Sequence, residues 1–156
     1  MKGNTGIGLT PTRSWKHTVV EISGILFILL LVYAAVAKLS DVEKFRNQLG
    51  QSSMLLPYVS WLYWGIPMTE ITLSVMLIFT ATRLPALYGC FFLMTLFTVY
   101  IFIVTRYSDQ VPCSCGGIIQ ELSWDQHLVF NLFFIVLAAL GVLVYPGRRS
   151  PEDIAQ

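Results

Sequence analysis

The chain has 156 residues, of which 55% are hydrophobic and only 12% are charged, and its formal net charge is +1. This composition, with a mean hydropathy of +0.66, is typical of an integral membrane protein in contact with the lipid bilayer. Lysine and arginine are scattered around the ends of hydrophobic segments and form no basic patch, which excludes nucleic acid as a partner. No repeat or linker divides the sequence, so we expect residues 1–156 to form a single membrane domain.

Four segments are long enough and apolar enough to cross a membrane, because a spanning helix needs roughly 20 apolar residues. They cover about residues 19–39, 58–81, 84–106 and 124–145. The first imitates a secretory signal, but its apolar run exceeds the roughly 7 to 15 residues of a signal core, so we expect it to remain as a helix. The short link at residues 82–85 requires a hairpin. The sequence therefore predicts an all-α, polytopic four-helix bundle with up-down-up-down topology.

The positions of lysine and arginine predict the orientation of this bundle, because the cytoplasmic side carries the excess. One side would carry Lys2, Arg13, Lys16, Arg83, Arg148 and Arg149, and the other Lys38, Lys44, Arg46 and Arg106. Both termini are then predicted to be cytoplasmic. In a bacterium the chain would be a multi-pass protein of the inner (cytoplasmic) membrane, and the loop at residues 108–122 would face the periplasm, where disulfides form and persist.

This outer loop contains two cysteines, Cys113 and Cys115, within the sequence PCSCGG at residues 112–117. The pair has three interpretations: a redox couple, a structural disulfide or part of a metal site. A disulfide between residues i and i+2 closes a very small ring that is strained and easily reduced, which favours exchange over a structural role. With His127 the cysteines supply only three ligands, whereas closed structural zinc sites use four, so we predict no metal site.

Three ionisable residues of the helical segments are further candidates. His127, at the outer end of the last segment, could help to form a thiolate or move a proton, although an interfacial histidine can also have no such role. Glu70 lies near the middle of the second segment, where a carboxylate is costly and tends to face a cavity or another helix. Lys38 ends the first segment, and its side chain either extends to the lipid headgroups or turns inward toward Glu70.

Three sequence patterns together resemble small bacterial membrane proteins of the DoxX/MauE type, the latter named for methylamine utilisation. The patterns are AVAKLSD at residues 35–41 running on to Phe45, PMTE at residues 67–70, and PCSCGG at residues 112–117 followed by Trp124, His127 and Asn131. The resemblance implies a redox-associated four-helix membrane protein that helps to form or maintain disulfides during maturation of an exported client protein. It also implies a thioredoxin-fold protein as a partner.

The sequence thus favours thiol–disulfide exchange by Cys113 and Cys115, which would make the chain a thiol–disulfide oxidoreductase. A quinone held near Lys38 and Glu70 would be the electron acceptor by analogy with other four-helix thiol oxidases. The main alternative is a non-enzymatic assembly factor, or a subunit of a larger envelope complex, with a structural cysteine loop. A third alternative is a small transporter or proton relay that uses Glu70.

Overall fold

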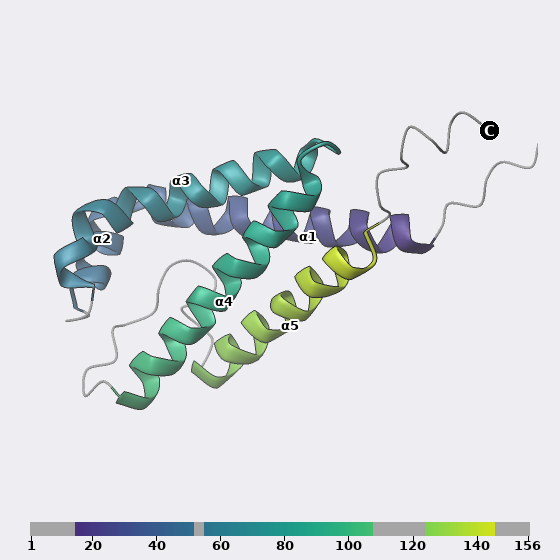
Figure 1. Cartoon of the computed structure of the whole chain (residues 1–156). Coiled ribbons are helices and arrows are strands. Elements are labelled where there is room, and N and C mark those ends of the chain that lie inside the picture. Colours follow the sequence, from purple (N-terminus) through teal and green to yellow (C-terminus); the bar gives the residue numbers. More distant parts are fainter. Residues whose placement is uncertain (1–14, 52–54, 108–123, 146–156) are drawn as a thin grey trace, which may run out of the picture.

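The computed structural model of the protein describes residues 15–51, 55–107 and 124–145. Within these ranges the chain is helical apart from short turns, and it contains no strand. The helices are α1 (Trp15–Ser40), α2 (Val42–Gly50), α3 (Val59–Ile78), α4 (Arg83–Tyr107) and α5 (Trp124–Leu143), and one turn of 3-10 helix (Leu56–Tyr58) leads into α3 (Figure 1).

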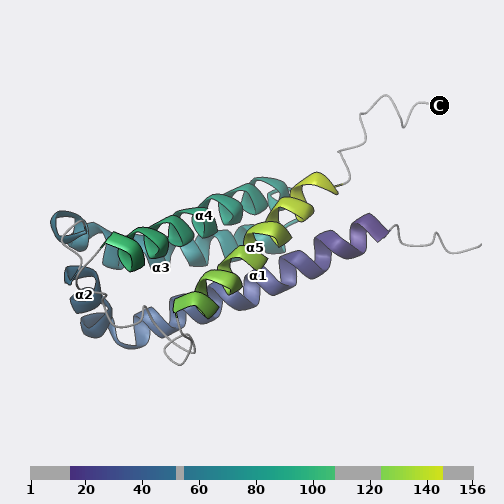
Figure 2. The same ribbon diagram turned by 90° about the horizontal axis from the view of Figure 1, so that it is seen from below.

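The four long helices run in alternating directions and form a bundle. Helix α1 packs against α3 and α5, and α4 packs against the same two helices, so α1 and α4 are diagonal partners. Helix α2 lies at one end of the bundle, which also contains the last turn of α4 and the first turn of α5 (Figures 1 and 2). We call this the α2 end. The predicted all-α, polytopic, up-down-up-down bundle is confirmed, while the cytoplasmic location of the termini stays a prediction.

Helix α2 was not predicted from the sequence, and it lies between the predicted spans at residues 19–39 and 58–81. Asp41 is its N-cap, because the side-chain oxygen Oδ1 accepts a hydrogen bond from the backbone N–H of Lys44 at 3.0 Å. Phe45 and Leu49 lie one turn apart and are buried, together with Val59 of α3. Helix α2 is therefore amphipathic and covers the end of the bundle beside α3.

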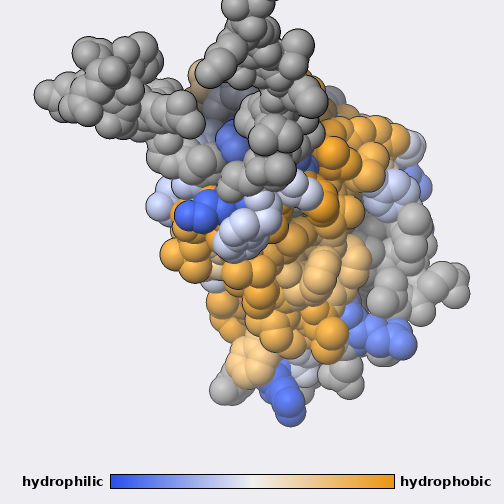
Figure 3. Space-filling model, turned by 90° about the vertical axis from the view of Figure 1, so that its right-hand side faces the viewer, coloured by the Kyte–Doolittle hydropathy of each residue, from blue (hydrophilic) through white to orange (hydrophobic). Residues whose placement is uncertain are grey.

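The surface of the bundle is that of a multi-pass membrane protein. Among the described residues, four helical stretches are long and apolar enough to cross a membrane: Trp15–Ser40, Leu56–Ile78, Arg83–Arg106 and Gln126–Leu143. Large hydrophobic side chains such as Leu29, Phe92 and Phe133 are exposed on their outer faces. Orange, hydrophobic residues also dominate the described surface in Figure 3. Exposure of such a large apolar surface to water would be unfavourable, and contact with lipid explains it.

The interior is formed by one stripe of each long helix. On α1 the buried positions recur every three or four residues, which is the spacing of one helix face: Val20, Gly24, Phe27, Leu31, Ala35 and Lys38. Phe27 meets Phe134 of α5 edge to face, with ring centroids 5.3 Å apart. Leu87, Cys90 and Met94 of α4 complete this core. Lys38 continues this regular spacing and is therefore part of the buried face of α1.

The end opposite to the α2 end is fixed by hydrogen bonds around the α3–α4 turn. The side chain of Arg83 donates from Nε to the carbonyl oxygen of Leu77 at 3.1 Å, and the Thr82 hydroxyl donates to that of Met76 at 2.7 Å. These donors satisfy carbonyl groups that the last turn of α3 leaves without a helical partner. Tyr145 lies just after α5, and its hydroxyl group also donates to the carbonyl oxygen of Thr80 at 3.1 Å.

Helices α3 and α4 approach closely at Gly89. A Cβ atom at this position would lie 2.5 Å from Cδ2 of Leu73, whereas a Cβ atom at Gly24 of α1 would meet no atom within 4 Å. We expect Gly89→Ala to lower the free energy of unfolding by about 1 to 3 kcal/mol, the usual effect of overpacking, because Leu73 must move. The matched control Gly24→Ala should change it by less than about 1 kcal/mol.

Thermal unfolding of the purified chain in detergent, followed by circular dichroism, measures both changes. Equal melting temperatures for the two variants would contradict the close α3–α4 approach.

Candidate functional site

Lys38 is buried inside the bundle although it lies in the last turn of α1. The residue is only 9% exposed, because it continues the inward stripe that contains Leu31 and Ala35. Of the two interpretations left open by the sequence, the structure therefore supports the inward orientation toward α3. A charged ammonium group in this position requires a partner, because an unpaired buried charge is strongly unfavourable.

The partner is Glu70 of α3. Glu70 is completely buried and belongs to the inward stripe of α3 with Pro67, Ser74 and Leu77. The ammonium nitrogen Nζ of Lys38 donates to the carboxylate oxygen Oε1 of Glu70 at 2.6 Å, and this contact is both a hydrogen bond and an ion pair. Two residues that are 32 positions apart in the sequence thus form one charged pair within the membrane-spanning part of the chain.

Two aromatic rings from other helices surround the ammonium group of Lys38. Nζ lies 5.8 Å from the ring centroid of Phe45 in α2 and 5.9 Å from that of Phe97 in α4. Both distances allow a cation–π attraction, which is stronger where water is excluded. Nζ also donates to the carbonyl oxygen of Ala34 at 3.4 Å. The site is therefore assembled from α1, α2, α3 and α4 and depends on their packing.

The pair leaves one strong acceptor unused. The second carboxylate oxygen of Glu70, Oε2, is buried and has no hydrogen-bond partner among the described residues. A buried carboxylate oxygen in this state can accept a proton, a water molecule or a donor group of a ligand. The amide nitrogen Nδ2 of Asn131 in α5 and the hydroxyl of Ser23 in α1 are also buried without such a partner. The interior thus has unused capacity for hydrogen bonds.

The other predicted site residues are not part of this contact. Cys113 and Cys115, with the whole predicted loop at residues 108–122, lie outside the described residues, and the side chain of Trp124 lies outside them too. His127 lies in the first turn of α5 and is half-buried. It forms no hydrogen bond or ion pair with any other described residue. The segment 108–123 joins helix ends that both lie at the α2 end (Figures 1 and 2).

The third cysteine, Cys90, is in a different environment. It is a free, completely buried residue of α4 and packs in the central hydrophobic core. A thiol in such surroundings is inert compared with one on an accessible loop. Among the described residues, no three histidine, cysteine, aspartate or glutamate side chains gather as ligands for a metal ion.

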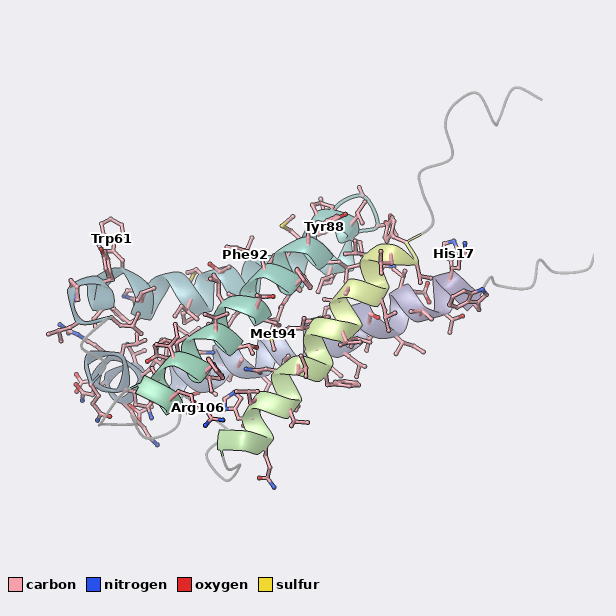
Figure 4. The ribbon with its side chains drawn as sticks, turned by 60° about the horizontal axis from the view of Figure 1, so that its bottom comes forward. His17, Trp61, Tyr88, Phe92, Met94 and Arg106 are labelled. Atoms are coloured by element: carbon pink, nitrogen blue, oxygen red, sulfur yellow. The ribbon has the colours of Figure 1, made fainter. Side chains whose placement is uncertain are left out.

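Aromatic and charged residues mark the two ends of the bundle. Trp61 is 82% exposed and points away from the helices at the α2 end, where Arg106 also lies at the end of α4 (Figure 4). His17 lies at the opposite end of α1 (Figure 4). Trp64 is exposed as well, whereas Tyr63 is half-buried. The aromatic residues at the start of the second span are therefore suitably placed for the headgroup level of a bilayer.

Sequence reasoning missed two components of the site, Phe97 and α2 with its Phe45. Phe45 could have been found, because Asp41 as N-cap and apolar residues at positions 42, 45 and 49 are typical of an amphipathic helix. Phe97 is one of many phenylalanines in an apolar span, and nothing in the local sequence distinguishes it.

The fold and the site define a class: a small, polytopic helical membrane protein with an ion pair buried inside its bundle. Comparison with protein families makes this more specific. The family of methylamine utilisation protein MauE matches residues 16–144, which contain the four spans except for the first residue of the first one, and the chain belongs to this family. No curated protein and no solved structure matches the chain significantly. The predicted resemblance to MauE is thus confirmed, and the resemblance to DoxX stays a prediction.

Proposed function

We propose that this chain is a membrane thiol–disulfide redox protein, which uses Cys113 and Cys115 to assist disulfide formation or maturation of an exported client protein. The observation that carries the proposal is the position of the two cysteines in the sequence between α4 and α5, because the two helix ends that flank them lie at the α2 end. Membership of the MauE family agrees with a role in a larger methylamine utilisation system. The proposed exchange requires of the client protein only that it has thiols that can form a disulfide.

The chemistry is an exchange between sulfur atoms. In the oxidising direction, a thiolate of the client attacks one sulfur of the Cys113–Cys115 disulfide, which breaks that bond and forms a mixed disulfide. A second client thiolate then releases the client as a disulfide and leaves both cysteines reduced. In the reducing direction the same steps run in reverse, and a thioredoxin-fold protein would supply the electrons. His127, in the first turn of α5, would accept or return the thiol proton.

Continued oxidation needs an acceptor, because conversion of the two thiols to a disulfide releases two electrons and two protons. A quinone would supply this chemistry when bound. The buried residues fit such a group: Lys38 offers ammonium hydrogens to a carbonyl oxygen, and Oε2 of Glu70 is an unused acceptor that can hold a proton. The rings of Phe45 and Phe97 provide apolar surface beside the ammonium group. Lys38 and Glu70 would thus orient the acceptor and move its protons.

Thiol labelling tests both the oxidised state of the pair and its location. We expect a membrane-impermeant maleimide to label Cys113 and Cys115 in spheroplasts only after reduction, because the pair is proposed to be an outward-facing disulfide. Cys90 should stay unlabelled until the membrane is dissolved and the chain unfolded, since it is completely buried. Mass-tag gel shifts count the labelled thiols.

A Cys90→Ala variant is the control, and its label count in intact spheroplasts should equal that of the unchanged chain. Labelling from the cytoplasmic side alone would contradict the predicted topology and the exported client together. A pair that is always reduced in growing cells would contradict the proposed oxidation cycle.

A further inference from the structure

The α2 end has a second polar feature, a groove between α2 and the first turns of α3. One hollow of about 350 Å³ is lined by Val42, Glu43, Arg46, Asn47, Tyr63 and Trp64. A second hollow of about 550 Å³ shares Arg46 and Asn47 and continues past Val59 and Ser60. We call the two hollows together the α2–α3 groove. Their volumes fall in the range of small-molecule sites, about 300 to 1,000 Å³.

The α2–α3 groove contains two opposite charges that do not neutralise each other. Glu43 and Arg46 are three residues apart on α2 and both are exposed, yet they form no ion pair with one another. The guanidinium carbon of Arg46 lies instead 5.7 Å from the ring centroid of Tyr63. Arg46 and Glu43 line the same hollow, which therefore offers both a cation and a carboxylate to a ligand.

The groove lies at the level where lipid headgroups are expected. Helix α2 connects two membrane spans, and the second span begins at Leu56, directly beside the groove. Tyr58 is 61% exposed and Trp61 is 82% exposed at this level. Tyrosine and tryptophan concentrate at the membrane–water interface because they combine an apolar ring with a polar group. A phospholipid at this position would have its phosphate beside Arg46.

We propose that the α2–α3 groove binds the headgroup of a zwitterionic phospholipid with a primary ammonium group, of the phosphatidylethanolamine class. The guanidinium of Arg46 donates to the phosphate, for which its planar fork is well suited. The carboxylate of Glu43 accepts from the ammonium group, and the ring of Trp64 offers a second surface to this cation. An anionic lipid without an amine leaves Glu43 unmatched. This site is independent of the proposed thiol chemistry.

Native mass spectrometry of the purified full chain, titrated separately with phosphatidylethanolamine and phosphatidylglycerol of the same acyl chains, tests this site. We expect the unchanged chain to bind phosphatidylethanolamine about tenfold more tightly. Arg46→Gln should weaken binding of both lipids about tenfold, because both contain the phosphate. Glu43→Gln should weaken binding of phosphatidylethanolamine alone and so remove the preference. The matched control Arg106→Gln, which removes an exposed arginine at the same end, should leave both affinities unchanged.

Three results would overturn the proposal. The first is equal binding of the two lipids by the unchanged chain. The second is an unchanged preference in Glu43→Gln, which removes a charge from an exposed residue and is expected to fold normally. The third is competition by inorganic phosphate that displaces phosphatidylethanolamine with the same dependence on Arg46, because the groove would then be a site for free anions.

Discussion

Replacing Lys38 by methionine is expected to lower the free energy of unfolding by about 3 to 5 kcal/mol, because the buried Glu70 carboxylate loses its charged partner. Glu70→Gln should have an effect of similar size, since it leaves the ammonium group of Lys38 without a counter-charge. The double variant Lys38→Met/Glu70→Gln should recover much of this loss, because it contains no buried charge at all. Reversible unfolding in a detergent–SDS titration, followed by tryptophan fluorescence, measures the three changes.

The matched control is Lys16→Met, which removes a lysine from the exposed start of the same helix. Its effect should stay below about 1 kcal/mol. The buried ion pair would be contradicted if each single variant lowered the free energy of unfolding as little as this control and the effects of the two single variants simply added up in the double variant.

The double variant also separates a structural role of the pair from the proposed role in proton movement. If the pair only stabilises the bundle, the recovered fold should support normal cycling of Cys113 and Cys115. If Lys38 and Glu70 orient an acceptor and move protons, the double variant should fold and yet keep the cysteines reduced in cells. Mass-tag trapping of the cysteine redox state is the measurement. Normal cycling in a well-folded double variant would remove Lys38 and Glu70 from the proposed mechanism.

Single replacements of the two loop cysteines are expected to have opposite effects on a covalent intermediate. In the reducing direction, one cysteine of the pair attacks a disulfide of the client as a thiolate and forms a mixed disulfide, which the neighbouring cysteine releases quickly. Replacing the resolving cysteine by serine should therefore trap the client, and replacing the attacking cysteine should abolish both the complex and the activity. On a non-reducing gel, one of Cys113→Ser and Cys115→Ser should give a higher band that reductant removes, and the other should give none.

Cys90→Ala is the control for this experiment, because it removes the buried thiol and leaves the loop pair intact. It should show the same bands as the unchanged chain. A structural disulfide would give a different result: either loop variant would lose stability to the same extent without a partner band. Full maturation of the client in both single variants and in the double variant would replace the redox proposal by the assembly-factor alternative.

The four spans were predictable because the information is local. A run of about 20 apolar residues has few alternatives to a membrane helix, since every backbone polar group must find a partner within lipid. The observed helices differ from the predicted ranges mainly at their ends: α1 begins at Trp15 and α3 ends at Ile78. Helix α2 was missed although Asp41 and the apolar positions 42, 45 and 49 are a local signal, and its short, polar sequence also packs against Val59 of α3, which lies later in the sequence.

The site was predictable only in part. The sequence by itself favoured a position of Glu70 that faces a cavity or another helix, because a carboxylate at that depth is costly in lipid. It also determined which thiols are candidates, because Cys113 and Cys115 lie in a polar connection and Cys90 in an apolar span. It did not decide the orientation of Lys38, since a lysine at a helix end can reach either the headgroups or the bundle.

Only the tertiary structure decided that orientation. The orientation of the Lys38 side chain depends on how α3 is positioned along α1. In the observed packing, Oε1 of Glu70 lies 2.6 Å from Nζ of Lys38. The orientation also depends on α2 and α4, which bring Phe45 and Phe97 to the same ammonium group. Glu70 and Phe97 belong to helices far from Lys38 in the sequence, and Phe45, although close in the sequence, belongs to the separate helix α2. A charge inside a membrane protein is stable where such packing supplies its partner, and no local pattern contains that information.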